Sequence, residues 1–104
     1  MKFILISRHT NGAEIPVSER ESNLKDMGEW IALLKPALAL PIRGGKSVTA
    51  KRVADYSGDV GGVIVFEADN IDEAVLLAQK SPGLKYGFTH EMFPEISLNQ
   101  AAQE

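Results

Sequence analysis

Two histidines, His9 and His90, are the side chains of this chain best suited to proton transfer near neutral pH. Each belongs to an apolar run, one near the start of the chain and one near its end. If the two runs are antiparallel neighbours in a sheet, alternation places Ser7 and His9 on one face of the first strand and His90 on one face of the other. Where those faces coincide, Ser7, His9 and His90 line one cleft. Otherwise His9 lies in water at a strand end and His90 is a half-buried packing residue.

A second group of candidates lies in residues 55–58, which read Asp-Tyr-Ser-Gly. Asp55 could orient a histidine or bind a substrate, and Tyr56 could cover a pocket. The same residue types also suit a plain turn, in which Asp accepts backbone N–H groups and Gly takes a positive φ. The candidate catalytic residues are therefore His9, His90 and Asp55, and the candidate substrate-binding residues are Ser7, Arg8 and Tyr56.

Glycines and basic residues supply weaker signals. Gly61-Gly62 opens a strand, where glycine is disfavoured, which indicates a β-bulge, tight packing or the close approach of a ligand. The basic residues Arg8, Arg43, Lys51 and Arg52 could bind a carboxylate, or they could simply line solvent-facing edges. No phosphate-loop motif is present, and two histidines without a carboxylate at fixed spacing predict no metal site.

The composition limits the classes of function. The 104 residues are enough for one domain. The net charge is −3 without a basic stripe, so we expect neither nucleic acid nor an anionic membrane as a partner. The absence of cysteine excludes disulfides and thiolate catalysis. The first apolar run is too short for a signal peptide or a membrane span, and we expect a cytoplasmic protein.

Helical periodicity is clear in two segments. Ser18 and Glu21 form a capping-box pattern, which predicts a helix over about residues 19–35 that ends before Pro36. Its apolar stripe is Leu24, Met27, Ile31, Leu34 and Leu38, with Trp30 beside it as a core or interface residue. Asn70 and Glu73 predict the cap of a second helix, which stops at residues 81–83.

Strand patterns fill most of the rest. Residues 2–9 and 86–93 predict strands, and residues 38–43 and 47–53 predict a hairpin that turns at Gly44-Gly45. Pro41 places the first arm of this hairpin at a sheet edge. Residues 60–67 are apolar on both faces, which indicates a strand in the interior of a sheet. Residues 99–104 predict a frayed tail.

This order of elements predicts an α+β protein of the ferredoxin-like class, an antiparallel sheet with two helices on one face. The strand at residues 2–9 and that at residues 60–67 then lie in the centre. The other sheet face is bare and apolar, and a homodimer that packs sheet against sheet is the simplest way to cover it. We take residues 1–96 as the single domain and residues 97–104 as a C-terminal tail.

The chain also resembles the YCII-related (DGPF-type) domain family over residues 1–96. The resemblance rests on residues 1–7 (MKFILIS), the hairpin with GGK, residues 55–58, Gly61-Gly62 and residues 70–74 (NIDEA). It implies a dimeric ferredoxin-like domain, known as a dimeric α+β barrel. It also implies a possible role as a small-molecule enzyme built on a His/Asp pair, while some family domains stand beside sigma factors.

The sequence departs from the family pattern at its histidines. The proposed catalytic histidine of the family lies in the first helix, where this chain has Leu24, Lys25 and Asp26. The closing strand of the family usually runs Gly-Gly-x-Val-Glu-Val, whereas residues 87–92 read Gly-Phe-Thr-His-Glu-Met. The resemblance therefore supports the fold and the dimer, and His9 and His90 are features of this chain.

Two functions fit these observations. One is a cofactor-independent small-molecule enzyme that performs acid–base chemistry in a cleft at the dimeric sheet, between sheet and helices, with His9, His90 and Asp55 as proton carriers. The other is a non-catalytic ligand-binding or protein-interaction module that acts as a homodimer. Geometry separates them, because an enzyme needs a histidine that opens into a pocket near Asp55 or Ser7.

Overall fold

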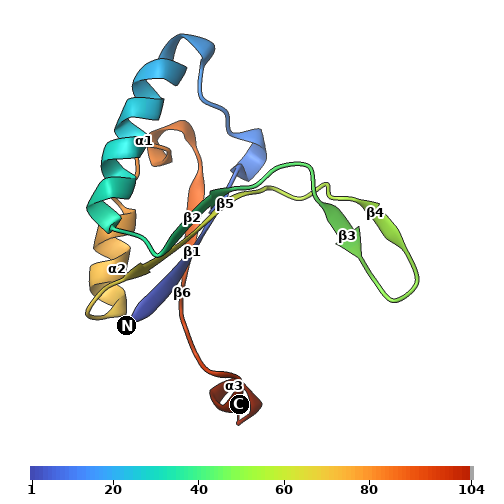
Figure 1. Cartoon of the computed structure of the whole chain (residues 1–104). Helices are drawn as coiled ribbons and strands as arrows, with labels where there is room; N and C mark the ends of the chain where they lie inside the picture. The colour runs from blue at the N-terminus through green and yellow to red at the C-terminus, as the bar shows by residue number, and fades with distance from the viewer. Residues whose placement is uncertain (104) are drawn as a thin grey trace.

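A four-stranded antiparallel sheet with the strand order β2-β5-β1-β6 forms the centre of the computed structural model, which describes residues 1–103 (Figure 1). Its strands are β1 (Lys2–Arg8), β2 (Leu38–Pro41), β5 (Val60–Glu67) and β6 (Thr89–Pro94). Helices α1 (Arg20–Leu34) and α2 (Ile71–Ala78) cover one face of this sheet (Figure 1). The predicted ferredoxin-like α+β fold is confirmed, with β1 and β5 as the central strands.

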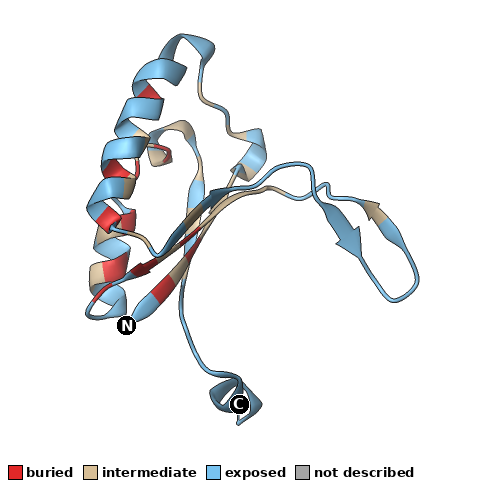
Figure 2. Cartoon of the chain, in the orientation of Figure 1, coloured by how far each residue is buried: buried red, intermediate tan, exposed pale blue. Residues whose placement is uncertain are grey.

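The core lies between the sheet and the two helices (Figure 2). Phe3 and Leu5 of β1 are fully buried and stand opposite Phe66 and Ile64 of β5 in the strand register. The remaining core side chains come mainly from the helices and are Trp30, Leu34, Ala68, Ala74 and Ala78. Since side chains alternate along a strand, Ser7, two residues beyond Leu5, faces the same layer.

Helix α1 spans nearly the predicted residues, but its start differs. Ser18 lies inside a 3-10 turn, η2 (Val17–Glu19), and makes no capping bond to the helix. The predicted capping box is therefore wrong, because the turn moves the N-cap to Glu19, beyond the reach of the Ser18 hydroxyl. Leu24 is 74% exposed, so it does not belong to the buried stripe as predicted; Asn23 and Trp30 are buried instead.

The predicted hairpin at residues 38–53 is also wrong in its pairing. Strand β2 pairs with β5 at the edge of the main sheet, as Pro41 indicated, but it does not pair with the following strand. Strands β3 (Lys46–Val48) and β4 (Val53–Asp55) form a separate two-stranded ribbon instead. The ribbon turns at Thr49, whose backbone N–H donates to the Arg52 carbonyl at 2.9 Å. The ladder between β2 and β5 is longer than the ladder between β3 and β4.

The C-terminal half follows the sequence more closely. Asn70 caps α2, since its Oδ1 accepts the Glu73 N–H at 2.9 Å. Strand β6 begins at Thr89 and not at Tyr86, because a 3-10 turn, η3 (Leu84–Tyr86), comes first and Gly87 takes a φ of 96°. The predicted frayed tail contains a short helix, α3 (Leu98–Ala102), which begins with a capping box between Ser97 and Gln100. A further 3-10 turn, η1 (Thr10–Gly12), follows β1.

The second sheet face carries no helix. It presents the alternate residues of each strand, among which Leu38, Leu40 and Phe93 are 43%, 49% and 48% exposed. The ribbon and α3 both extend away from the helical layer (Figure 1). The bare apolar face that the sequence predicted is therefore present. Among residues 1–103 no helix is long and apolar enough to cross a membrane.

Candidate functional site

Ser7 and His90 stand directly opposite each other in the register of β1 and β6. Directly opposed residues of antiparallel strands have Cβ atoms about 4.5–5.5 Å apart and project from the same face. Ser7 faces the helices, so His90 does too. The predicted pairing of the first and last strands therefore brings these two polar side chains together under the helical layer.

A pocket of about 270 Å³ lies between this end of the sheet and α1. The sheet contributes Ser7, Ala39, Leu40, Pro41, Gly61, Gly62, Ile64 and His90, and the helix contributes Leu24, Met27, Trp30 and Ile31. The wall contains no carboxylate, ammonium or guanidinium group, and the imidazole is its only titratable side chain. A ligand in this pocket would therefore meet a mainly apolar wall with two polar groups at one side, which is the usual design of a small-molecule site.

The His90 imidazole is held in an apolar setting. Its ring lies parallel to the Trp30 indole, with 5.7 Å between the ring centroids and 7° between the planes. Nδ1 lies 3.1 Å from the Thr89 carbonyl oxygen, and Nε2 is buried without a hydrogen-bond partner. Burial lowers the pKa of His90 below its ordinary value of 6.5. The ring is therefore neutral at pH 7, and a proton on Nδ1 that donates to Thr89 leaves a lone pair on Nε2.

Trp30 is the residue of this site that the sequence alone did not identify as a site residue. Its indole N–H donates to the Leu77 carbonyl oxygen of α2 at 2.9 Å, which fixes the ring between the two helices and the sheet. The predicted core position is confirmed, since Trp30 is only 4% exposed. The spacing of three residues between Met27 and Trp30 was the sequence signal for this position, because it places both side chains on the helix face that meets the sheet. The stacking on His90 depends on the tertiary structure.

His9 lies apart from this pocket, just beyond the end of β1. Its Nδ1 is 3.2 Å from the Ala13 carbonyl oxygen, and its ring meets the Phe88 ring edge to face at 4.7 Å. The ring also lies over Gly61, where an added Cβ would be 2.3 Å from His9 Nε2. A register shift in β1 at Ser7 and Arg8 leaves Gly61 unpaired, so the predicted bulge and the predicted tight packing occur together.

A second hollow, of about 340 Å³, is lined by His9 together with Arg43, Tyr56 and Asp59. It lies where the ribbon leaves the sheet, and neither Ser7 nor His90 lines it. The two histidines therefore open into different spaces.

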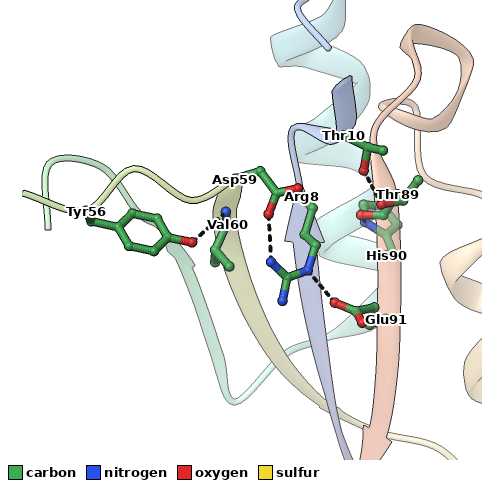
Figure 3. A network of polar contacts seen from close by, with 8 residues as sticks. All are labelled: Arg8, Thr10, Tyr56, Asp59, Val60, Thr89, His90 and Glu91. Carbon is green, nitrogen blue, oxygen red and sulfur yellow. Dashed lines mark hydrogen bonds and ion pairs between the residues drawn. The ribbon is translucent and has the colours of Figure 1, made fainter. Parts of the chain in front are cut away.

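The remaining candidates make contacts of their own. Asp55 lies on β4 and forms an ion pair with Lys46 across the ribbon. Tyr56 folds over Gly58, and its hydroxyl oxygen accepts the Val60 N–H at 3.2 Å (Figure 3). Asp55 is thus not brought to either histidine, and Tyr56 closes the turn that leads into β5.

Arg8 bridges two strands on the other side of β1 from Ser7. Its guanidinium donates to Asp59 at 2.7 Å and to Glu91, as Figure 3 shows. The hydrogen bonds to Glu91 and Asp59 raise the pKa of Arg8 above its ordinary value. Among the six candidate site residues, only Ser7 and His90 therefore line the pocket under α1.

Comparison with known proteins adds a family and a fold. The family model described as YCII-related domain matches residues 1–92. Among solved structures the chain is similar to the 5-chloro-2-hydroxyhydroquinone dehydrochlorinase (TftG) from Burkholderia phenoliruptrix AC1100, in a complex with 2,5-dihydroxybenzoquinone. The two chains are 18% identical, the match covers 96% of this chain and 98% of that one, and the TM-score is 0.61. No curated protein sequence matches the chain.

Proposed function

The chain belongs to the YCII-related domain family, and from this premise we propose that it is a small-molecule enzyme in which His90 is the general base. The pocket under α1 is the proposed active site, and Ser7 is the proposed substrate-binding residue beside the base. The observation that carries the proposal is the neutral imidazole, whose buried Nε2 has no partner within the protein. A buried acceptor without a partner costs about 1–3 kcal/mol, which a ligand hydroxyl could recover.

The family pattern supports a proton carrier in the space between α1 and the sheet. The resemblance implies a histidine in the first helix, but this chain has Leu24, Lys25 and Asp26 there. The imidazole that reaches the space between α1 and the sheet comes from β6 instead. We propose that the general base of this chain acts from the sheet side of the layer, opposite the helix that usually carries it.

The proposed substrate is a single hydroxylated ring. The similar dehydrochlorinase is in a complex with 2,5-dihydroxybenzoquinone, and a pocket of about 270 Å³ with an indole wall suits one planar ring. The His90 ring would turn on binding so that Nε2, which is buried in the free chain, accepts the proton of a ring hydroxyl, and Ser7 would hold a second oxygen of the ring. Proton transfer of this kind needs no cofactor, because the imidazole alone supplies the base.

Binding of hydroquinone and of methylhydroquinone, which keep their hydroxyl protons at pH 7.5, tests this proposal by calorimetry at that pH. We expect His90→Gln to weaken binding about two- to tenfold, since a hydrogen bond between neutral groups contributes about 0.5–1.5 kcal/mol. Ser7→Ala should weaken it less. His9→Gln is the matched control and should bind as the natural chain does. The proposal fails if neither compound binds, or if His90→Gln and His9→Gln bind equally well.

The alternative function is a non-catalytic binding module in which the homodimer is the functional unit. The bare sheet face favours a dimer, because Leu38, Leu40 and Phe93 leave an apolar surface beside the bridged Arg8 side chain. We propose that two copies pack these faces together. The same dimer is compatible with the enzyme, since the pocket under α1 lies on the opposite side of the sheet.

Light scattering at about 100 µM protein tests the dimer. Leu38→Lys places a charge on the bare face at a half-exposed position of the edge strand, outside the lining of the pocket under α1, and should give a folded monomer. Leu33→Lys is the matched control, because Leu33 is 51% exposed on α1 and should leave the dimer intact. A monomeric natural chain would overturn the proposed sheet-to-sheet dimer.

A further inference from the structure

A smaller pocket of about 130 Å³ lies under α2, next to the proposed active site. Its lining residues are Val75, Ala78, Gln79, Leu84, His90 and Met92. His90 is the only residue that lines both this pocket and the larger one under α1. Met92 follows His90 by two residues on β6, so both side chains face the helices. The imidazole is therefore the partition between two neighbouring spaces, one under each helix.

The His90 imidazole, which separates the two pockets, makes few polar contacts. Nδ1 contacts only the carbonyl oxygen of the preceding residue, Thr89, and Nε2 has no partner. The Trp30 indole supports one face of the ring. Rotation of the imidazole would therefore break at most one hydrogen bond and the stacking on Trp30.

The chemistry of the smaller pocket differs from that of the larger one. Four of its six lining residues are aliphatic or thioether side chains, and Gln79 is its only polar group besides the imidazole. Neither pocket wall carries a formal charge other than the titratable ring. A volume of about 130 Å³ equals the liquid volume of about four waters, which a short alkyl chain or a similar apolar group would fill.

We propose that the pocket under α2 is a subsite for a short apolar substituent of the ligand whose hydroxylated ring binds beside Ser7 and His90. The proposal rests on the proposed function, because it needs the ring to bind under α1. The proposed substrate class is a hydroxylated ring with one short apolar group. That group passes the His90 side chain and lies against Met92. The substituent is then recognised by burial alone, without hydrogen bonds.

The methionine methyl groups report on the two pockets separately. Met27 lines only the pocket under α1, Met92 lines only the pocket under α2, and Met1 lines neither. In a chain labelled with 13C at the methionine methyls, hydroquinone should shift the Met27 signal. Methyl-, ethyl- and propylhydroquinone should shift both Met27 and Met92, and Met1 serves as the internal control. The dissociation constant should fall up to about fourfold for each added carbon.

A variant that fills the subsite gives a second test. Val75 is 40% exposed at the rim of the smaller pocket, so Val75→Phe should leave the fold and the binding of hydroquinone unchanged. It should abolish the gain in affinity from the alkyl groups. Leu76→Phe, on the neighbouring exposed position of α2, is the matched control and should keep that gain.

The outcomes separate the two proposals. If no compound shifts Met27, the ring does not bind under α1 and the proposed function itself fails. If all compounds shift Met27 while Met92 stays unchanged and the affinity does not rise with chain length, the ring site stands and the subsite is overturned. An equal gain in affinity for Val75→Phe and Leu76→Phe would also overturn the subsite.

Discussion

Acid should weaken the fold through the buried imidazole of His90. Its pKa lies below 6.5 in the folded chain because burial disfavours the charged ring, whereas the unfolded chain has the ordinary value. This contribution to stability is fully present above pH 6.5. It is lost as the pH falls from 6.5 toward the folded-state pKa, because the unfolded state then binds a proton that the folded state does not.

The size of the effect follows from proton linkage. Where one more proton is bound in the unfolded state, the free energy of unfolding falls by about 1.4 kcal/mol per pH unit. In His90→Phe an aromatic ring still stacks on Trp30, but no group titrates there. As the pH is lowered from 7.5 to 5.0, the free energy of unfolding should therefore fall more for the natural chain than for His90→Phe.

Urea unfolding followed by fluorescence measures this difference, since Trp30 is the only tryptophan and lies against the imidazole. His9→Gln is the matched control and should keep the slope of the natural chain, because His90 is intact in it. All other titratable groups are common to the natural chain and His90→Phe and cancel in that comparison. The reasoning is refuted if His90→Phe and the natural chain lose stability in parallel between pH 6.5 and 5.0.

Three further substitutions test the contacts that build the site. Gly61→Ala should destabilise by about 1–3 kcal/mol because its Cβ would meet the His9 ring, and the loss should shrink in the double variant with His9→Ala; equal losses in both backgrounds would contradict the contact. Asn70→Ala should cost about 1 kcal/mol in urea unfolding, whereas Ser18→Ala should cost almost nothing, so equal effects would contradict the cap assignment. Trp30→Phe removes the indole N–H that donates to the Leu77 carbonyl, which still accepts the Lys80 N–H, and should cost about 0.5–1.5 kcal/mol in urea unfolding; an unchanged stability would argue against the indole hydrogen bond.

The proposed base lies on the sheet side of the pocket under α1. Side chains from β6 and from α1 both line this pocket. In this chain Trp30 occupies the helix side of the layer and supplies the apolar surface that keeps the His90 ring neutral.

Much of the fold could be predicted because its signals are local. Strand β5 has the predicted bounds, since a run that is apolar on both faces can only lie inside a sheet. The α2 cap needs only Asn70 and Glu73, three residues apart. The order of elements predicts that the last strand lies beside β1, whereas it leaves open the register that sets Ser7 opposite His90.

Other features depend on contacts between residues far apart in the sequence, and no local pattern reports them. The hairpin prediction failed because β2 pairs with the edge of β5, far along the chain, while the segment after β2 pairs within the ribbon. Asp55 was placed near the histidines by its family motif, but the ribbon carries it away to Lys46. The α3 helix was missed although Ser97 and Gln100 form a capping box, because the tail offers no apolar stripe to support it.

The sequence by itself determined the class of fold, the central strands and the bare apolar face, because periodicity, caps and strand order are properties of the chain. Only the tertiary structure decided that Ser7 and His90 lie opposite each other and which pocket each histidine lines. His9 rests on Gly61 and Phe88, while His90 is stacked on Trp30 from another element and shielded from water. Burial sets the protonation state of an imidazole, and burial depends on which elements pack around it.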